Sequence, residues 1–192
     1  GDILFSHSKC AEARAAYSEA ASLMRRLPDA QSLSMQSYMT VTDSMQGDIL
    51  LAEGKPKEAL DIQKIVLARR LELNRLSGGF IDSQPLTYNI GNVQVSLAQA
   101  YAALNQLDLA IEHARDAVKN YEAAVRTNPY QRELAAALLL QGDLEARQGY
   151  RVQALQAWQG AKSLMEPLAA KDPAALPRQK LLREIRSRLS SR

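Results

Sequence analysis

The chain has 192 residues, 46% of them hydrophobic, and a formal net charge of +3. From Lys171 onward seven Lys or Arg stand against two Asp or Glu, so this tail carries +5 and the rest of the chain −2. The length suits one domain or one short repeat array, and no apolar run is long enough to span a bilayer. Cys10 is the only cysteine, which excludes a disulfide framework and a cysteine-based metal site and is typical of the reducing cytoplasm.

Apolar residues recur at helical spacing along most of the chain. The first residues match the middle of a pattern that returns later, so we expect a fragment of a longer protein or one trimmed at a domain edge. Between residues 56 and 76 the spacing predicts a helix whose arginines, Arg69, Arg70 and Arg75, form a solvated back face. The predicted helices cover about 9–27, 30–53, 56–76, 87–104, 107–126, 131–148 and 151–168, with a last amphipathic helix from about 177.

The segment 77–85 interrupts this helical pattern with two glycines and a proline. Phe80 and Ile81 are apolar, and we expect them to pack back onto the neighbouring helices. The segment is therefore interpreted as a packed connector, with a hinge or a partner-binding loop as the alternative.

A repeated pattern organises the helices. Residues 47–60 and 142–155 share two glycines and an Ala-Leu pair in register, and weaker copies lie at 1–13 and 98–111. In each copy a small residue precedes a turn residue by seven positions, and an Ala followed by an apolar residue comes next. We expect the small residues where two helices approach closely and the turn residues, Gly54, Gly149 and Asn105, in a left-handed conformation. Ser8 stands at this turn position in the first copy.

This pattern resembles the tetratricopeptide repeat (TPR) family. The resemblance implies an all-α fold, a right-handed superhelical solenoid of antiparallel helix pairs. It divides one domain, 1–192, into repeats at about 1–29, 30–79, 87–128 and 130–170 and a capping helix at 174–190. The copies are offset by 46, 51 and 44 residues rather than the roughly 34 of ordinary repeats, which indicates a long-helix variant. The family's usual Trp and Leu-Gly opening is missing.

In TPR arrays the first helix of each pair lines a concave groove, and the residue after its small position faces that groove. Here the groove has an apolar floor with spaced acidic groups, which favours a basic and apolar peptide. The alternative is that the aspartates pair with Arg or Lys of adjacent repeats or with a chain terminus. The residues predicted to line the groove are Asp2, Phe5, Ser44, Asp48, Leu51, Asn92, Val95, Gln99, Leu139, Asp143 and Arg147.

The sequence offers no catalytic constellation. His7 and His113 have no Cys, His or carboxylate at ligand spacing, Cys10 has no His-Asn context, and no phosphate-binding loop is present. We therefore predict no metal, no cofactor and no enzymatic activity. The basic tail is interpreted as the solvated face of a cap, with a nucleic-acid or anionic-membrane patch as the alternative; it lacks aromatic residues for base stacking.

These features predict a scaffold that recognises a protein or peptide, the interaction or sensory module of a larger protein. Similar long repeats accompany bacterial signalling proteins, which suggests such a parent. Two alternatives remain: a self-associating structural scaffold, or an accessory domain of an enzyme whose catalytic part lies upstream.

Overall fold

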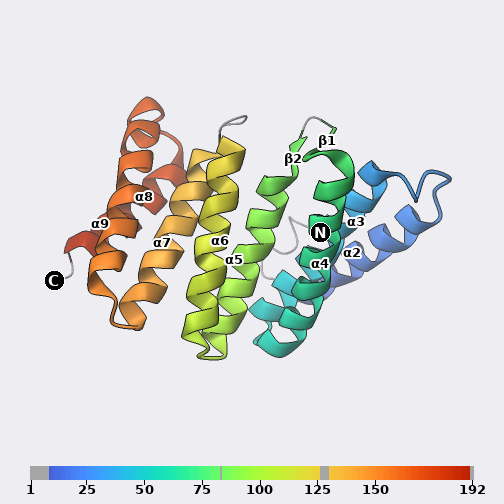
Figure 1. Cartoon of the computed structure of the whole chain (residues 1–192), viewed down its shortest axis with the longest axis horizontal. Coiled ribbons are helices and arrows are strands. Elements are labelled where there is room, and N and C mark those ends of the chain that lie inside the picture. Colours follow the sequence, from blue (N-terminus) through green and yellow to red (C-terminus); the bar gives the residue numbers. More distant parts are fainter. Residues whose placement is uncertain (1–8, 83, 126–129, 191–192) are drawn as a thin grey trace.

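The structure is a computed structural model that describes residues 9–82, 84–125 and 130–190 (Figure 1). In this part of the chain eight helices carry the fold, which confirms the predicted all-α class. Asp2, Phe5, His7 and Ser8 lie outside the described residues. The helices are α2 (Cys10–Arg25), α3 (Leu33–Ala52), α4 (Pro56–Ser77), α5 (Leu86–Ala103), α6 (Leu107–Val125), α7 (Gln131–Arg147), α8 (Arg151–Lys171) and α9 (Leu176–Ser190).

Local sequence signals set most helix ends. α3 begins three residues later than expected, because the Ser32 hydroxyl accepts a hydrogen bond from the Met35 N–H (3.1 Å) and caps the helix there. Pro56 opens α4, where its missing N–H leaves no bond unmade. The turns after α3, α5 and α7 contain Gly54, Asn105 and Gly149 with φ of +76°, +58° and +89°. The predicted left-handed turns are confirmed at all three positions.

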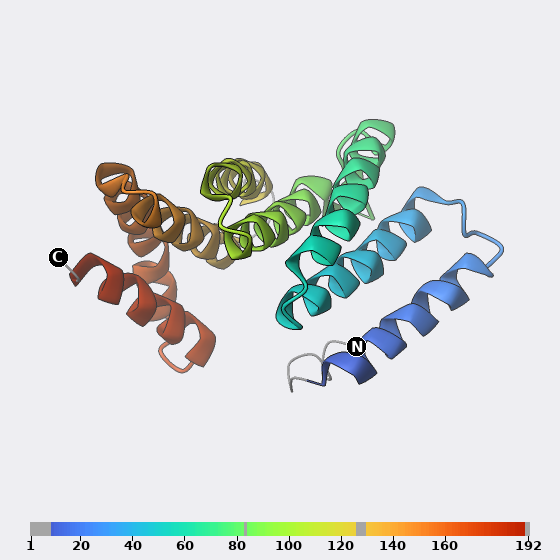
Figure 2. The ribbon, with the colours of Figure 1, turned by 90° about the horizontal axis from the view of Figure 1, so that it is seen from below.

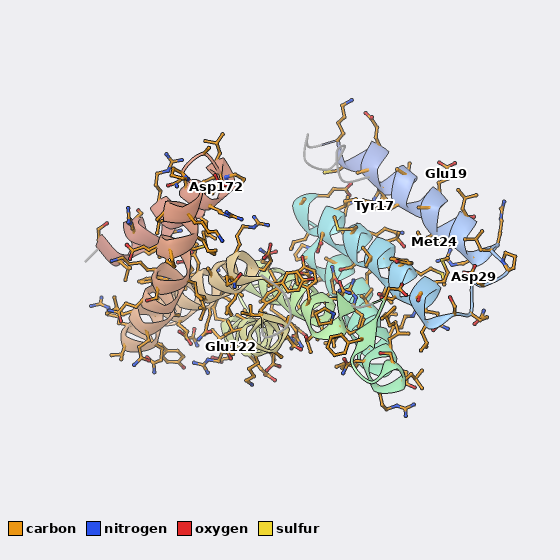
Figure 3. The ribbon with its side chains drawn as sticks, turned by 90° about the horizontal axis from the view of Figure 1, so that it is seen from above. Tyr17, Glu19, Met24, Asp29, Glu122 and Asp172 are labelled. Carbon is orange, nitrogen blue, oxygen red and sulfur yellow. The ribbon has the colours of Figure 1, made fainter. Side chains whose placement is uncertain are left out.

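The helices pack in chain order. Each helix from α3 to α8 contacts both the helix before it and the helix after it, and together they form one row along the longest axis (Figure 1). α3 also contacts α5, and α7 contacts α9. The row is curved, with α2 and α9 at its two ends lying toward the same side of the central helices (Figure 2). In α2, Tyr17 lies on the side that faces α3 and Glu19 lies on the outer side (Figure 3).

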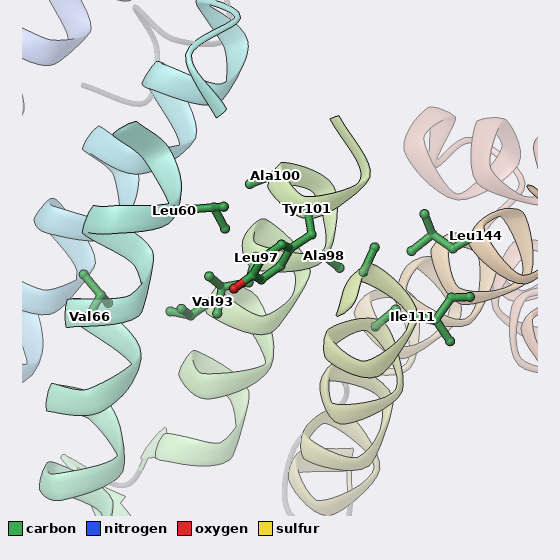
Figure 4. Close-up of a cluster of buried hydrophobic side chains, with 11 residues drawn as sticks. Leu60, Val66, Val93, Leu97, Ala98, Ala100, Tyr101, Ile111 and Leu144 are labelled. Carbon is green, nitrogen blue, oxygen red and sulfur yellow. The ribbon is translucent and has the colours of Figure 1, made fainter. Parts of the chain in front are cut away.

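The largest core cluster joins four consecutive helices, α4 to α7 (Figure 4). Leu60 and Val66 come from α4, Leu97 from α5, Ile111 from α6 and Leu144 from α7, and all are buried. A second cluster at the other end holds Trp158 and Met165 of α8 against α7 and α9. Because the clusters extend from one helix pair to the next, burial of each pair depends on its neighbours.

Two glycines lie where paired helices come closest. A Cβ atom on Gly47 of α3 would stand 2.6 Å from Gln63 Nε2 of α4, and one on Gly142 of α7 would stand 2.5 Å from Trp158 Nε1 of α8. The predicted close approach at these small residues is confirmed. It positions the next residue in each copy, Asp48 or Asp143, beside the partner helix.

The connector between α4 and α5 is a short antiparallel strand pair, β1 (Phe80–Ile81) and β2 (Gln84–Pro85). Ile81 is buried against Leu73, Leu86 and Leu33, as expected. The expectation for Phe80 is wrong: its side chain is 48% exposed, because successive residues of a strand point to opposite faces.

Candidate functional site

Six of the predicted groove residues line one cavity of about 550 Å³ between α3 and α5. α3 contributes one wall, α5 the other, and single residues of α4 and α6, Arg70 and Tyr121, complete it. The two walls belong to helices that contact each other directly, although α4 separates them in the chain. The lining residues are Val41, Ser44, Met45, Asp48, Leu51, Ala52, Arg70, Asn89, Asn92, Val95, Ser96, Gln99 and Tyr121.

Asp48 is the acidic group of this cavity. Its Oδ1 accepts hydrogen bonds from Gln63 Nε2 (2.9 Å) and Ser96 Oγ (2.6 Å), so it joins α3 to both α4 and α5. Within the described chain no hydrogen bond reaches Oδ2. Burial raises the pKa of the Asp48 carboxyl, against the smaller opposing effects of the Ser96 hydroxyl and the Arg70 charge. Asp48 therefore keeps one oxygen open for a donor.

Gln63 holds this carboxylate from the α4 side. Its side chain is 1% exposed and fills the space above Gly47. Nε2 also donates to the Ser44 carbonyl oxygen (2.9 Å), and the Ser44 hydroxyl donates to Gln63 Oε1 (3.1 Å). Since these bonds use both ends of the amide, the Gln63 orientation is fixed and Asp48 is pre-positioned.

Arg70 corrects one sequence expectation. Arg69 and Arg75 are exposed and pair with Asp43 and Glu72, as a solvated face requires, but Arg70 is only 2% exposed. Its guanidinium donates to Thr40 Oγ1 (3.2 Å), to the Thr40 carbonyl oxygen (3.2 Å) and to the Asn89 carbonyl oxygen. Burial lowers the pKa of Arg70 to about 10, so the side chain remains a cation at neutral pH.

The reason for this error lies in the spacing of α4. Ala59, Gln63, Val66, Arg70 and Leu73 are all buried, and they follow one another at the three- and four-residue steps of a single helical face. This spacing could have revealed Arg70 and Gln63 as interior polar residues. It could not reveal their partners, because those partners are groups of α3 and α5.

Side-chain amides line the α5 wall. Asn89, Asn92 and Gln99 are spaced at three and seven residues and all face the cavity. Asn92 Oδ1 accepts a hydrogen bond from the Tyr121 hydroxyl (2.6 Å), whose pKa burial raises, so Tyr121 stays a donor. Within the described residues the Asn92 and Gln99 amide nitrogens donate no hydrogen bond. The wall therefore offers donors and acceptors to a ligand.

The remaining predicted groove residues lie elsewhere. Leu139 is buried in the second core cluster, with Ala135 and Trp158. Arg147 is exposed at the end of α7, and its Nη2 donates to the Ala102 carbonyl oxygen at 3.4 Å. Asp143 accepts hydrogen bonds from Trp158 Nε1 (3.1 Å) and from Arg188 Nε and Nη2 (3.0 and 3.2 Å). At Asp143 the structure therefore shows the alternative, pairing with a basic residue of a neighbouring element.

The other candidates from the sequence sit in packing environments. The His113 ring stacks on Tyr101 with centroids 5.2 Å apart and hydrogen-bonds Gln94 Oε1, and burial lowers its pKa. Cys10 is half-buried at the start of α2. Across residues 9–82, 84–125 and 130–190 no three His, Cys, Asp or Glu side chains are grouped as metal ligands. None of the described helices is both long and apolar enough to cross a membrane.

Comparisons with known proteins concern the fold alone. No protein-family model and no curated protein matches the chain. Among solved structures, the chain is similar to BtubC (BKLC) from P. vanneervenii, with a TM-score of 0.53 and 17% sequence identity. The similarity covers 92% of this chain and 71% of that one.

Proposed function

We propose that the chain is a TPR-like solenoid that binds a peptide segment of a partner protein in the cavity between α3 and α5. The observation that carries this proposal is the cavity itself, which lies on the side where α3 and α5 meet and is lined by six residues predicted for a groove. The left-handed turns and the close helix contacts at Gly47 and Gly142 support the solenoid.

The chemistry of the walls suits a peptide. An extended peptide presents alternating N–H and C=O groups, and the amides of Asn89, Asn92 and Gln99 can pair with either kind. On the opposite wall Val41, Met45 and Leu51 offer apolar surface for a side chain. Such a combination of apolar walls with a few placed polar groups is typical of binding sites.

The proposal can be tested by selecting peptides from a random peptide library on the immobilised protein. The selected peptides are then measured against Gln99→Trp, which places a large ring in the cavity mouth, where Gln99 is exposed. The matched control is Gln156→Trp, because Gln156 is an exposed glutamine of α8 outside the cavity.

We expect at least tenfold weaker binding to Gln99→Trp and unchanged binding to Gln156→Trp. Equal binding to both variants would place the peptide on another surface and contradict the proposal.

A further inference from the structure

The two strongest copies of the repeat pattern hold their aspartates in the same way. Asp48 follows Gly47 and accepts from Gln63, and Asp143 follows Gly142 and accepts from Trp158. In each copy the donor lies on the paired helix, fifteen residues after the aspartate, and covers the glycine. The chain thus contains two versions of one carboxylate site.

The two versions differ in their second donor. Asp143 accepts two hydrogen bonds from Arg188 of α9: Nε donates to Oδ1 and Nη2 donates to Oδ2. At Asp48 the second donor is the shorter side chain of Ser96 of α5, whose hydroxyl donates to Oδ1 alone. The space that a long side chain would fill remains a cavity at Asp48, and Oδ2 is left open there.

We propose that Asp48 binds the guanidinium of an arginine side chain carried by the bound peptide, as Asp143 binds Arg188 within the chain. This inference rests on the proposed function and names the ligand chemistry of the same cavity. The aliphatic part of the arginine would lie against Met45, Leu51 and Val95, and its head would donate to Asp48 Oδ2. The amide oxygens of Asn89 and Gln99 belong to the same cavity and supply further acceptors.

Arg70 does not already fill this role. Its three nitrogens donate to oxygens of Thr40 and Asn89, and it forms no ion pair with any carboxylate of the described residues. Its charge favours the ionised form of Asp48 and also weakens the attraction for a second cation. We therefore expect millimolar affinity for a single arginine derivative, with the rest of a peptide adding to it.

The experiment uses N-acetyl-arginine amide as the probe and N-acetyl-citrulline amide as its neutral, nearly isosteric control. Both are titrated into ¹⁵N-labelled protein, and backbone amide shifts near the cavity are followed by NMR. The variant Asp48→Asn removes the charge but keeps an oxygen for Gln63 and Ser96. We expect saturable shifts at Ser96 and Gln99 with the arginine probe, at least fivefold weaker binding to Asp48→Asn, and no saturation with citrulline.

A second variant tests the internal comparison. Trp158 is the only tryptophan, so its indole N–H gives one resonance beside Asp143. In the native protein Asp143 is already paired with Arg188, so the probe should leave the indole resonance unshifted. In Arg188→Gln the carboxylate is released, and the probe should produce a saturable shift of the indole signal.

Equal shifts with citrulline, or unchanged affinity of Asp48→Asn, would overturn the inference. Library peptides that lack basic residues but respond to Gln99→Trp would also overturn it, while leaving the peptide-binding function intact. If the arginine probe binds at Asp48 but no library peptide responds to Gln99→Trp, the contact is supported and the proposed function is the part that fails.

Discussion

Gly142 lies directly beneath the indole of Trp158, so close that a Cβ atom on Gly142 would stand 2.5 Å from Nε1 and 2.6 Å from Cδ1. The backbone of α8 also approaches this point, with the Ala154 carbonyl oxygen 3.1 Å from the same position. Neither the rigid ring nor the helix backbone can shift easily to make room for a methyl group here. The glycine therefore sets the distance between α7 and α8.

Gly142→Ala should therefore destabilise the fold by about 1–3 kcal/mol, because the added methyl group overpacks the contact. Gly160→Ala is the control, since Gly160 lies within α8 and its Cβ would meet only the side chain of Leu138, with Cδ1 at 3.4 Å and Cδ2 at 4.0 Å. There the better helix propensity of alanine should stabilise by about 0.5–1 kcal/mol. Urea unfolding followed by circular dichroism measures both; equal effects of the two substitutions would contradict the role given to Gly142.

Arg70→Met should cost about 3 kcal/mol, because it leaves the Thr40 and Asn89 carbonyl oxygens without their donor and Asp48 without a nearby cation. Adding Asp48→Asn should stabilise this variant by more than it stabilises the native protein, because the buried carboxylate has lost its nearby cation, with a coupling of about 1 kcal/mol. The exposed Arg69→Met is the matched control and should cost under about 1 kcal/mol. Strict additivity in a double-mutant cycle of unfolding free energies would show that Arg70 and Asp48 do not interact.

Asp48→Asn should make the protein more stable at pH 7, by an amount that depends on pH. Burial raises the pKa of Asp48, so the folded state binds the proton more tightly than the unfolded chain. Native stability is then fully present below the unfolded pKa and falls as the pH rises through the folded one. The asparagine variant lacks this loss, so its advantage in Tm should shrink toward zero on acidification.

Thermal unfolding between about pH 3 and pH 7, a range that includes the usual Asp pKa, measures this difference. The exposed Asp61→Asn serves as the control substitution on α4. A variant that is less stable than the native protein by the same amount at every pH would contradict the expected linkage.

Arg188→Gln should change stability by less than about 1 kcal/mol, because both partners of the Arg188–Asp143 pair are partly exposed. The loss should shrink further in about 1 M salt, where the charges are screened. Arg183→Gln on the same helix is a suitable control, since Arg183 is exposed and forms no ion pair with the described residues. A loss that is large and insensitive to salt would mean that α9 depends on Arg188 for its docking.

The sequence predicted the helices and their turns well because those features depend on local signals. Gly54, Gly149 and Asn105 occupy left-handed turns because few other residues do so at low cost, and Pro56 opens a helix for an equally local reason. The repeated glycines predicted where helices touch, and Gly47 and Gly142 confirm it.

The site was harder to predict because its chemistry depends on distant partners. Asp48 and Asp143 occupy equal positions in the pattern, yet Ser96 meets one and Arg188 the other. Helical spacing placed Leu139 one turn from Asp143 but could not show that the second core cluster buries it. The charge of Arg70 predicts an exposed side chain. In the structure the side chain is buried, and three oxygens of α3 and α5 accept hydrogen bonds from its guanidinium.

The strand pair between α4 and α5 has a mechanical consequence for the cavity. Asp82, at its turn with a φ of +50°, accepts hydrogen bonds from Ser34 Oγ (3.0 Å) and Tyr38 Oη (3.2 Å) in the first half of α3. The connector is thus tied to the very helix that faces α5 across the cavity. A ligand that separates α3 from α5 would therefore rotate the two helices about the connector at Asp82. The distance between Leu51 and Gln99, at the far ends of the two helices, would increase most.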